Sequence, residues 1–180
     1  SLWAINPDGV NARLVYGNYT KAPHCTFEPR SIPGSRKIIF TASGHHAQTM
    51  GSLVLLDPAL GSEGAAPITR LTPDTPFPEV EGWPHAYYAN PWPLSERAHL
   101  VSWGVEERIN QDQMRPQNGM GLYLFNAGTG LELLYRDPES RGLHPDGDIV
   151  ATPAPTSSLS LADVQWTAPF LLIVAAYALT

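Results

Sequence analysis

The sequence predicts an all-β fold built from short strands and frequent turns, and its composition leads to that prediction. Its 180 residues include 18 prolines and 15 glycines. Proline removes a backbone donor and an interior glycine weakens a helix, so long helices are nearly excluded. Because 43% of the residues are apolar and 9% are aromatic, a disordered or collagen-like chain is excluded as well. What remains is a globular protein long enough to bury a hydrophobic core.

Three stretches of the chain repeat one pattern, in which a short apolar strand, a turn and a second short strand follow one another. The first strands of the three copies begin at Leu2, Leu53 and Leu122. The turns contain Asn, Asp or Gly, which tolerate the positive φ angles of tight hairpins. Each copy therefore predicts a β-hairpin.

A further strand is expected ahead of the second and third copies. Residues 36–43 follow a turn at 32–35, and residues 99–104 follow a Pro-rich turn at 90–95. A short additional strand should precede each of these turns. A four-stranded unit that recurs about every 40 to 50 residues is typical of a β-propeller blade.

The sequence thus predicts a β-propeller fragment of about two to three four-stranded antiparallel blades in an incomplete ring. The propeller part covers residues 1–150, with blade strands near 2–16, 36–72 and 99–135. Closed propellers need about four to eight blades. The chain also starts in the middle of a strand pattern without an initiator Met, so we expect a piece of a longer polypeptide.

The remaining segments are predicted to lie outside the blades. Inserts are expected at 73–84 and 106–120, and residues 151–180 form a linker-like segment with an atypical tail. The tail contains the apolar run 170–179. A helix needs about 20 apolar residues to cross a bilayer, so no membrane span is expected.

The charge balance and the single cysteine exclude several functional classes. The chain carries 11 Lys and Arg against 17 Asp and Glu, a formal net charge of −6. A nucleic-acid partner is excluded, because such proteins need a basic face for the phosphates. Cys25 alone forms neither an internal disulfide nor a Cys-x-x-Cys-His haem attachment site. The sequence contains no nucleophile elbow, P-loop, His-Glu-x-x-His motif or dinucleotide fingerprint, so we predict no catalytic residues in this segment.

Four side chains are candidate metal ligands: His45, His46, Cys25 and His85. Imidazole and thiolate groups bind zinc and haem iron. The spacing of these residues matches no compact zinc motif, so separate loops would have to assemble the site. Solvated or locally bonded imidazoles and an inert, buried thiol are the alternative.

The segment 81–88 is rich in aromatic rings and also holds a carboxylate and an imidazole. Such residues line a pocket or central channel, or they pack between blades, and the sequence leaves both interpretations open. Glu79 and Glu81 lie in a predicted loop, so we expect both carboxylates to be solvated.

Residues 32–42, closed by the strand and turn at 52–58, resemble TolB-like, WD40-like propeller repeats. Those repeats have a Ser-Pro-Asp-Gly-Lys turn before an apolar strand, and here Pro33-Gly34-Ser35-Arg36-Lys37 occupies the turn. Residues 32–58 together with 81–96 resemble the hydrazine synthase alpha-subunit middle domain family. This second resemblance covers roughly residues 1–138.

The resemblance implies a propeller inside a larger, periplasmic or otherwise extracytoplasmic protein, often beside cytochrome-c-like modules. It implies no cofactor within this segment, and haem c or zinc in the full-length protein. The expected function is a non-catalytic scaffold and protein-interaction module, whose partners are the other blades and domains of the longer chain and further proteins. The alternative is the propeller part of a multihaem oxidoreductase similar to the hydrazine synthase alpha subunit. A third hypothesis for the function is a propeller that accompanies a hydrolase domain, as in prolyl peptidases.

Overall fold

The structure is a computed structural model that describes residues 1–46, 50–105 and 120–136, and within these ranges the chain is all-β. Ten strands form three antiparallel sheets. The first sheet contains β1 (Leu2–Ala4) and β2 (Arg13–Tyr16). The second contains β3 (Cys25–Ser31), β4 (Ile38–Ser43), β5 (Ser52–Leu56) and β6 (Ile68–Arg70). The third contains β7 (Ala86–Pro93), β8 (Ala98–Val105), β9 (Gly121–Asn126) and β10 (Gly130–Tyr135).

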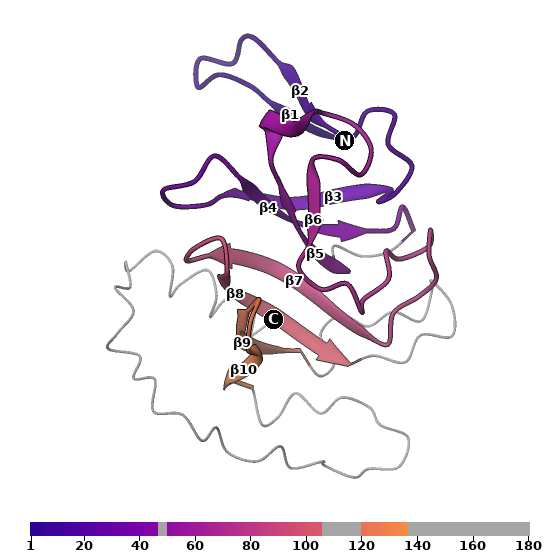
Figure 1. Ribbon diagram of the computed structural model, residues 1–180, viewed down its shortest axis with the longest axis vertical. Coiled ribbons are helices and arrows are strands. Elements are labelled where there is room, and N and C mark those ends of the chain that lie inside the picture. The colour runs from indigo at the N-terminus through magenta and orange to yellow at the C-terminus, as the bar shows by residue number, and fades with distance from the viewer. Residues whose placement is uncertain (47–49, 106–119, 137–180) are drawn as a thin grey trace.

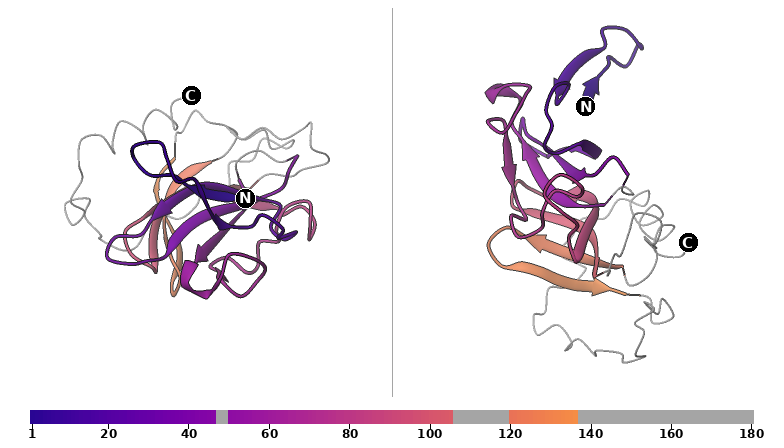
Figure 2. Two further views of the ribbon diagram at one scale, coloured as in Figure 1. Left: turned by 90° about the horizontal axis from the view of Figure 1, so that it is seen from above. Right: turned by 90° about the vertical axis from the view of Figure 1, so that its right-hand side faces the viewer.

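The three sheets follow one another in chain order along the longest axis of the molecule (Figures 1 and 2). Both four-stranded sheets are meanders, because each strand pairs with the next one in the sequence. The strand β7, at one edge of its sheet, contacts β3, β4 and β5 of the preceding sheet. The short 3-10 turn Pro58–Leu60 follows β5.

The two four-stranded sheets repeat one another in register and in turn chemistry. Leu56, the last residue of β5, pairs with the first residue of β4, and Asn126, the last residue of β9, pairs with the first residue of β8. The side chain of Asp57 accepts a hydrogen bond from the Ala59 N–H at 3.1 Å, and the Asn126 side chain accepts one from the Gly128 N–H at 2.9 Å. The repeat predicted from the sequence is therefore a structural repeat as well.

The strand β7 corrects the prediction of a turn at 90–95. Residues 90–93 belong to the strand, which has a bulge at Asn90 and Pro91, and the turn begins only at Leu94 and Ser95, whose N–H groups donate to the Ala98 carbonyl at 2.9 and 3.1 Å. Proline cannot donate to a β-ladder, so it is tolerated in strands only at an edge or a bulge. Both conditions hold here, because β7 is an edge strand and Pro91 lies in its bulge.

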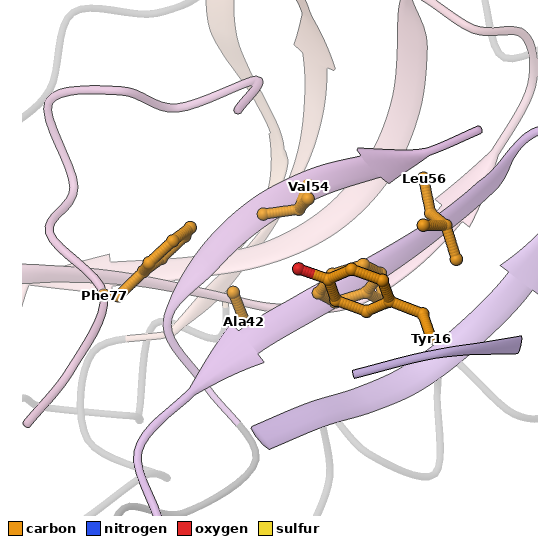
Figure 3. Close-up of a cluster of buried hydrophobic side chains, with 6 residues drawn as sticks. Tyr16, Ala42, Val54, Leu56 and Phe77 are labelled. Atoms are coloured by element: carbon orange, nitrogen blue, oxygen red, sulfur yellow. The ribbon is translucent and has the colours of Figure 1, made fainter. Parts of the chain in front are cut away.

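A cluster of apolar side chains fills the space between β1–β2 and the first four-stranded sheet (Figure 3). Its buried members are Tyr16, Phe40, Ala42, Val54, Leu56 and Phe77. The rings of Tyr16 and Phe40 lie with their centroids 6.1 Å apart. The Tyr16 hydroxyl donates to the Gly64 carbonyl at 2.8 Å, so its polar atom is satisfied. Burial of each large apolar side chain stabilises the fold by about 1.5–3 kcal/mol.

A second cluster lies between the two four-stranded sheets. It consists of Leu53, Tyr88, Val101, Tyr123 and Phe125. The backbone joins the sheets at the same place, since Gly51 and Tyr88 exchange N–H to carbonyl hydrogen bonds, both at 2.8 Å. The two sheets therefore form one continuous body.

Several predictions concern segments outside the described residues. These are most of the insert at 106–120, the segment 151–180 and its apolar run at 170–179. In the part of the chain that the structure describes, no helix has the length and apolar character needed to span a bilayer.

Candidate functional site

Three histidines surround one carboxylate at the corner where β3 begins and β4 ends. His24 directly precedes β3, His45 and His46 follow β4, and Glu79 belongs to the insert between β6 and β7. The Nδ1 atom of His46 lies 2.5 Å from Glu79 Oε1, and the Nδ1 atom of His24 lies 3.5 Å from Glu79 Oε2. Each of these histidines thus lies 33 or more residues from Glu79 in the chain.

Backbone groups hold Glu79 in this place. The N–H groups of His45 and His46 donate to Glu79 Oε2 at 2.5 and 3.1 Å. The Glu79 N–H donates to the Gly82 carbonyl at 2.9 Å. A side chain at position 44 would block this approach, because a Cβ on Gly44 would lie 2.9 Å from Glu79 Oε2.

The hydrogen bonds stabilise the ionised form of Glu79. The His46 side chain contributes most, followed by the N–H groups of His46 and His45 and the His24 side chain, and together they lower the pKa of Glu79 to about 2 despite partial desolvation. Glu79 is therefore a carboxylate at neutral pH. Its main effect is to join the β4–β5 connection to the insert that precedes β7.

The structure places the four predicted metal ligands as follows. His45 and His46 are exposed neighbours, with their rings edge to face and their centroids 4.7 Å apart. Cys25 begins β3 and is half-buried, and burial, with the charge of Glu79, raises the pKa of its thiol. His85 is exposed and directly precedes β7. Within residues 1–46, 50–105 and 120–136, no three His, Cys, Asp or Glu side chains are arranged to hold a metal ion, so the metal site stays a prediction.

Two members of this cluster, His24 and Glu79, are not among the predicted metal ligands. His24 has no motif around it, and Glu79 was expected to be solvated together with Glu81. Glu81 is also bonded, since it accepts from the Arg70 guanidinium at 3.0 Å and from the Phe77 N–H at 2.8 Å. Glu81 is exposed, as expected, whereas Glu79 is half-buried, so the expectation of a solvated carboxylate was wrong for Glu79. A local signal does exist for Glu81, because its partner Phe77 lies only four residues away.

A second polar contact joins the two four-stranded sheets at equivalent positions. Glu28 in β3 and Asn90 in β7 each precede a proline, lie in a bulge and have positive φ angles of 54° and 50°. The Glu28 carboxylate accepts from the N–H and the Nδ2 atom of Asn90, both at 2.6 Å. Burial raises the pKa of Glu28, and its hydrogen bonds with Asn90 oppose that rise. The first strands of the two sheets are therefore bonded to one another through matching bulges.

Glu79→Gln tests whether the carboxylate holds the β4–β5 connection. The neutral amide of glutamine offers one acceptor oxygen in place of two, so we expect faster hydrogen exchange at the backbone amides of His45 and His46. Glu81→Gln is the matched control, because it makes the same change of charge in the same insert but acts on Phe77 and Arg70. Unchanged exchange in Glu79→Gln, or an equal increase in the control, would contradict this assignment.

Comparison with known proteins gives no family for this chain. No protein-family model matches it, and neither a curated protein nor a solved structure is significantly similar to it. The resemblance to TolB-like repeats and to the hydrazine synthase alpha-subunit family rests on the sequence blocks quoted above.

Proposed function

We propose that β3–β6 and β7–β10 are successive blades of a β-propeller, and that β1–β2 is the outer strand pair of the blade before them. The observation that carries the proposal is the contact between the first strands of the two sheets. Propeller blades are four-stranded sheets arranged around a central channel, so their first strands have to meet near the axis. Here β7 contacts β3, and the pair Glu28 and Asn90 joins them at equivalent bulges.

The hydrophobic packing supports the same arrangement. Each blade of a propeller buries its faces against its neighbours. The first four-stranded sheet does so with the cluster around Phe40 on one side and with the cluster around Leu53 on the other. Two full units and one partial unit fall short of the roughly four to eight blades of a closed ring, so the proposal includes further blades of a longer protein.

In this proposal the segment acts as a scaffold and protein-interaction module of a larger extracytoplasmic protein. The chemistry of the histidine cluster supports a structural role. Glu79 is bonded to two imidazoles and two backbone amides, and the raised pKa of Cys25 keeps its sulfur a thiol at neutral pH. The extracytoplasmic location rests on the family resemblance alone.

Electron microscopy of the complete protein tests the propeller. We expect a disc-shaped body with a central channel, in which further four-stranded sheets flank the two described here. A sheet β7–β10 that packs against an unrelated fold would overturn the proposal. An absorption spectrum and metal analysis of the same preparation address the alternative, because a Soret band from bound haem would favour the oxidoreductase over the scaffold.

A further inference from the structure

A cavity of about 250 Å³ lies between the loop that follows β6 and the turn that joins β9 to β10. The loop contributes Leu71, Thr72, Pro73, Asp74 and Thr75, and the turn contributes Asn126, Ala127, Gly128 and Gly130. Tyr88 and Phe125 also line the cavity. Pockets for drug-sized ligands measure about 300–1,000 Å³, so this cavity fits a smaller group, such as one long side chain.

The two aromatic rings form the apolar part of the cavity. Tyr88 and Phe125 lie edge to face, with centroids 5.9 Å apart and planes at 81°. Both side chains are nearly fully buried and belong to the core between the sheets. Their positions are therefore set by packing. Aromatic rings attract ammonium and guanidinium groups through the negative charge of their faces.

Asp74 gives the cavity its charge. Of the described residues that line the cavity, Asp74 alone is charged. Within the described parts of the chain, no ion pair or hydrogen bond of its carboxylate is found. The pKa of Tyr88 is raised, mainly by burial and to a smaller extent by the negative charge of Asp74, so this charge acts on a residue that lines the cavity.

Two other polar side chains of the cavity, Thr72 and Asn126, already make hydrogen bonds within the chain. Thr72 Oγ1 lies 2.9 Å from Ser52 Oγ and accepts from the Leu53 N–H at 2.9 Å. The Asn126 side chain accepts from the Gly128 N–H. Among the described residues that line the cavity, the carboxylate of Asp74 is the charged acceptor available to a ligand.

We propose that this cavity receives a single lysine side chain from a partner protein. The aliphatic stem would lie against Tyr88 and Phe125, and the ammonium group would pair with Asp74, which combines a cation–π contact with a charge-assisted hydrogen bond. The net charge of −6 favours a basic partner. The cavity is a feature of the described residues and does not depend on the proposed propeller. Only the choice of a protein as the source of the cation rests on the proposed function.

A cation of the chain itself lies at the rim of the cavity. A Cβ on Gly128 would lie 2.8 Å from the Nη2 atom of Arg97, so the guanidinium of Arg97 is beside that edge. A like charge weakens the binding of an incoming ammonium group. Removal of the Arg97 charge should therefore strengthen binding, whereas removal of the Asp74 charge should weaken it.

The test is titration of the 15N-labelled protein with a five-residue, end-capped alanine peptide that carries lysine at its centre. The amide signals of Asp74, Thr75, Gly128 and Gly130 are expected to shift. A peptide with norleucine in place of lysine has the same stem without the charge, and we expect it to bind at least about fivefold more weakly. Tetramethylammonium is the third probe and is expected to bind more weakly than the lysine peptide.

Three variants complete the experiment. We expect Asp74→Asn to weaken binding of the lysine peptide about fivefold, and Arg97→Gln to strengthen it. Asp8→Asn makes the same change of charge as Asp74→Asn in the distant β1–β2 turn and should leave binding unchanged. Asp74 is exposed, so the fold should tolerate its replacement, and the dispersion of the amide signals verifies this.

Four outcomes would overturn the proposal. These are absence of shifts at the four amides, equal binding of the lysine and norleucine peptides, equal losses in Asp74→Asn and Asp8→Asn, and tighter binding of tetramethylammonium than of the lysine peptide. The last result would assign the cavity to a free small cation. Failure of the propeller would show separately in the electron micrographs, so the two proposals can fail independently.

Discussion

Gly51→Ala is expected to destabilise the protein by about 3 kcal/mol or more. A Cβ at this position would overlap the carbonyl oxygen of Ala42, and it would also lie 3.2 Å from the Cδ atom of Pro78. The carbonyl is backbone of β4, which is hydrogen-bonded to strands on both sides, so it cannot move without disrupting a ladder. The same residue forms the bridge to Tyr88 that joins the two sheets.

Urea unfolding, followed by tryptophan fluorescence and circular dichroism, measures this effect. Gly128→Ala is the matched control, because the atom nearest to its Cβ is the mobile end of Arg97 and the φ angle is not in the left-handed region. We expect this control to change the free energy of unfolding by less than about 1 kcal/mol. A Gly51→Ala protein as stable as this control would show that the sheets are not joined as described.

His99→Ile is expected to remove most of the pH dependence of stability between pH 7.5 and 5. His99 is fully buried in β8 and stacks on Phe125 with centroids 6.2 Å apart. Among the described residues, neither ring nitrogen has a hydrogen-bond partner. Burial lowers the pKa of His99 to about 4, and the nearby backbone of Glu96 opposes this only in part. Isoleucine is the choice because Ile39 holds the corresponding second position of β4.

Burial lowers the pKa of His99 in the fold, so His99 makes the protein less stable as the pH falls. In the unfolded chain His99 takes up a proton near its ordinary pKa of about 6.5, whereas in the fold it stays neutral down to about pH 4. The contribution of neutral His99 to stability is therefore complete above pH 6.5 and is lost as the pH falls toward 4. The loss amounts to about 2 kcal/mol between pH 7.5 and 5.

Three carboxylates with shifted pKa values do not mask the effect of His99 on stability between pH 7.5 and 5. The pKa values of Asp57 and Glu79 are lowered to about 2, so both carboxylates lose their contributions only below their ordinary range. The pKa of Glu28 is raised, so its protonation favours the fold at lower pH and acts in the opposite direction. The test is to measure the free energy of unfolding in urea at pH 5, 6 and 7.5. The wild type and His99→Ile are compared at each pH. Parallel pH profiles of the two proteins would contradict the assignment.

Local turn chemistry made much of the fold predictable. Asp57, which follows β5, and Asn126, which ends β9, each accept a hydrogen bond from the backbone N–H two residues further along. Such contacts depend on a few φ and ψ angles and on residue type. The hairpins and the repeat of four strands were therefore visible in the sequence. The turn at 90–95 was not, because proline marks an edge strand as well as a turn, and only pairing with neighbours shows which strands lie at an edge.

The polar contacts between distant segments were not predictable in the same way. The Glu28–Asn90 pair spans 62 residues, and the Glu79–His46 pair spans 33. Nothing near Glu28 or Glu79 in the sequence indicates a partner. In the segment 81–88, Tyr88 is buried between the two four-stranded sheets and also lines the cavity, so this one residue has both a packing role and a pocket position.

The sequence by itself determined that this protein is made of short antiparallel strands joined by Asn, Asp and Gly turns. Hydrogen bonds inside a hairpin depend on nearby residues, so their signal is local. The tertiary structure decided that three histidines surround Glu79, that Glu28 meets Asn90, and that Asp74 lies at a cavity floored by Tyr88 and Phe125. Those arrangements depend on how whole sheets stack, which is set by many weak packing contacts and not by any single residue.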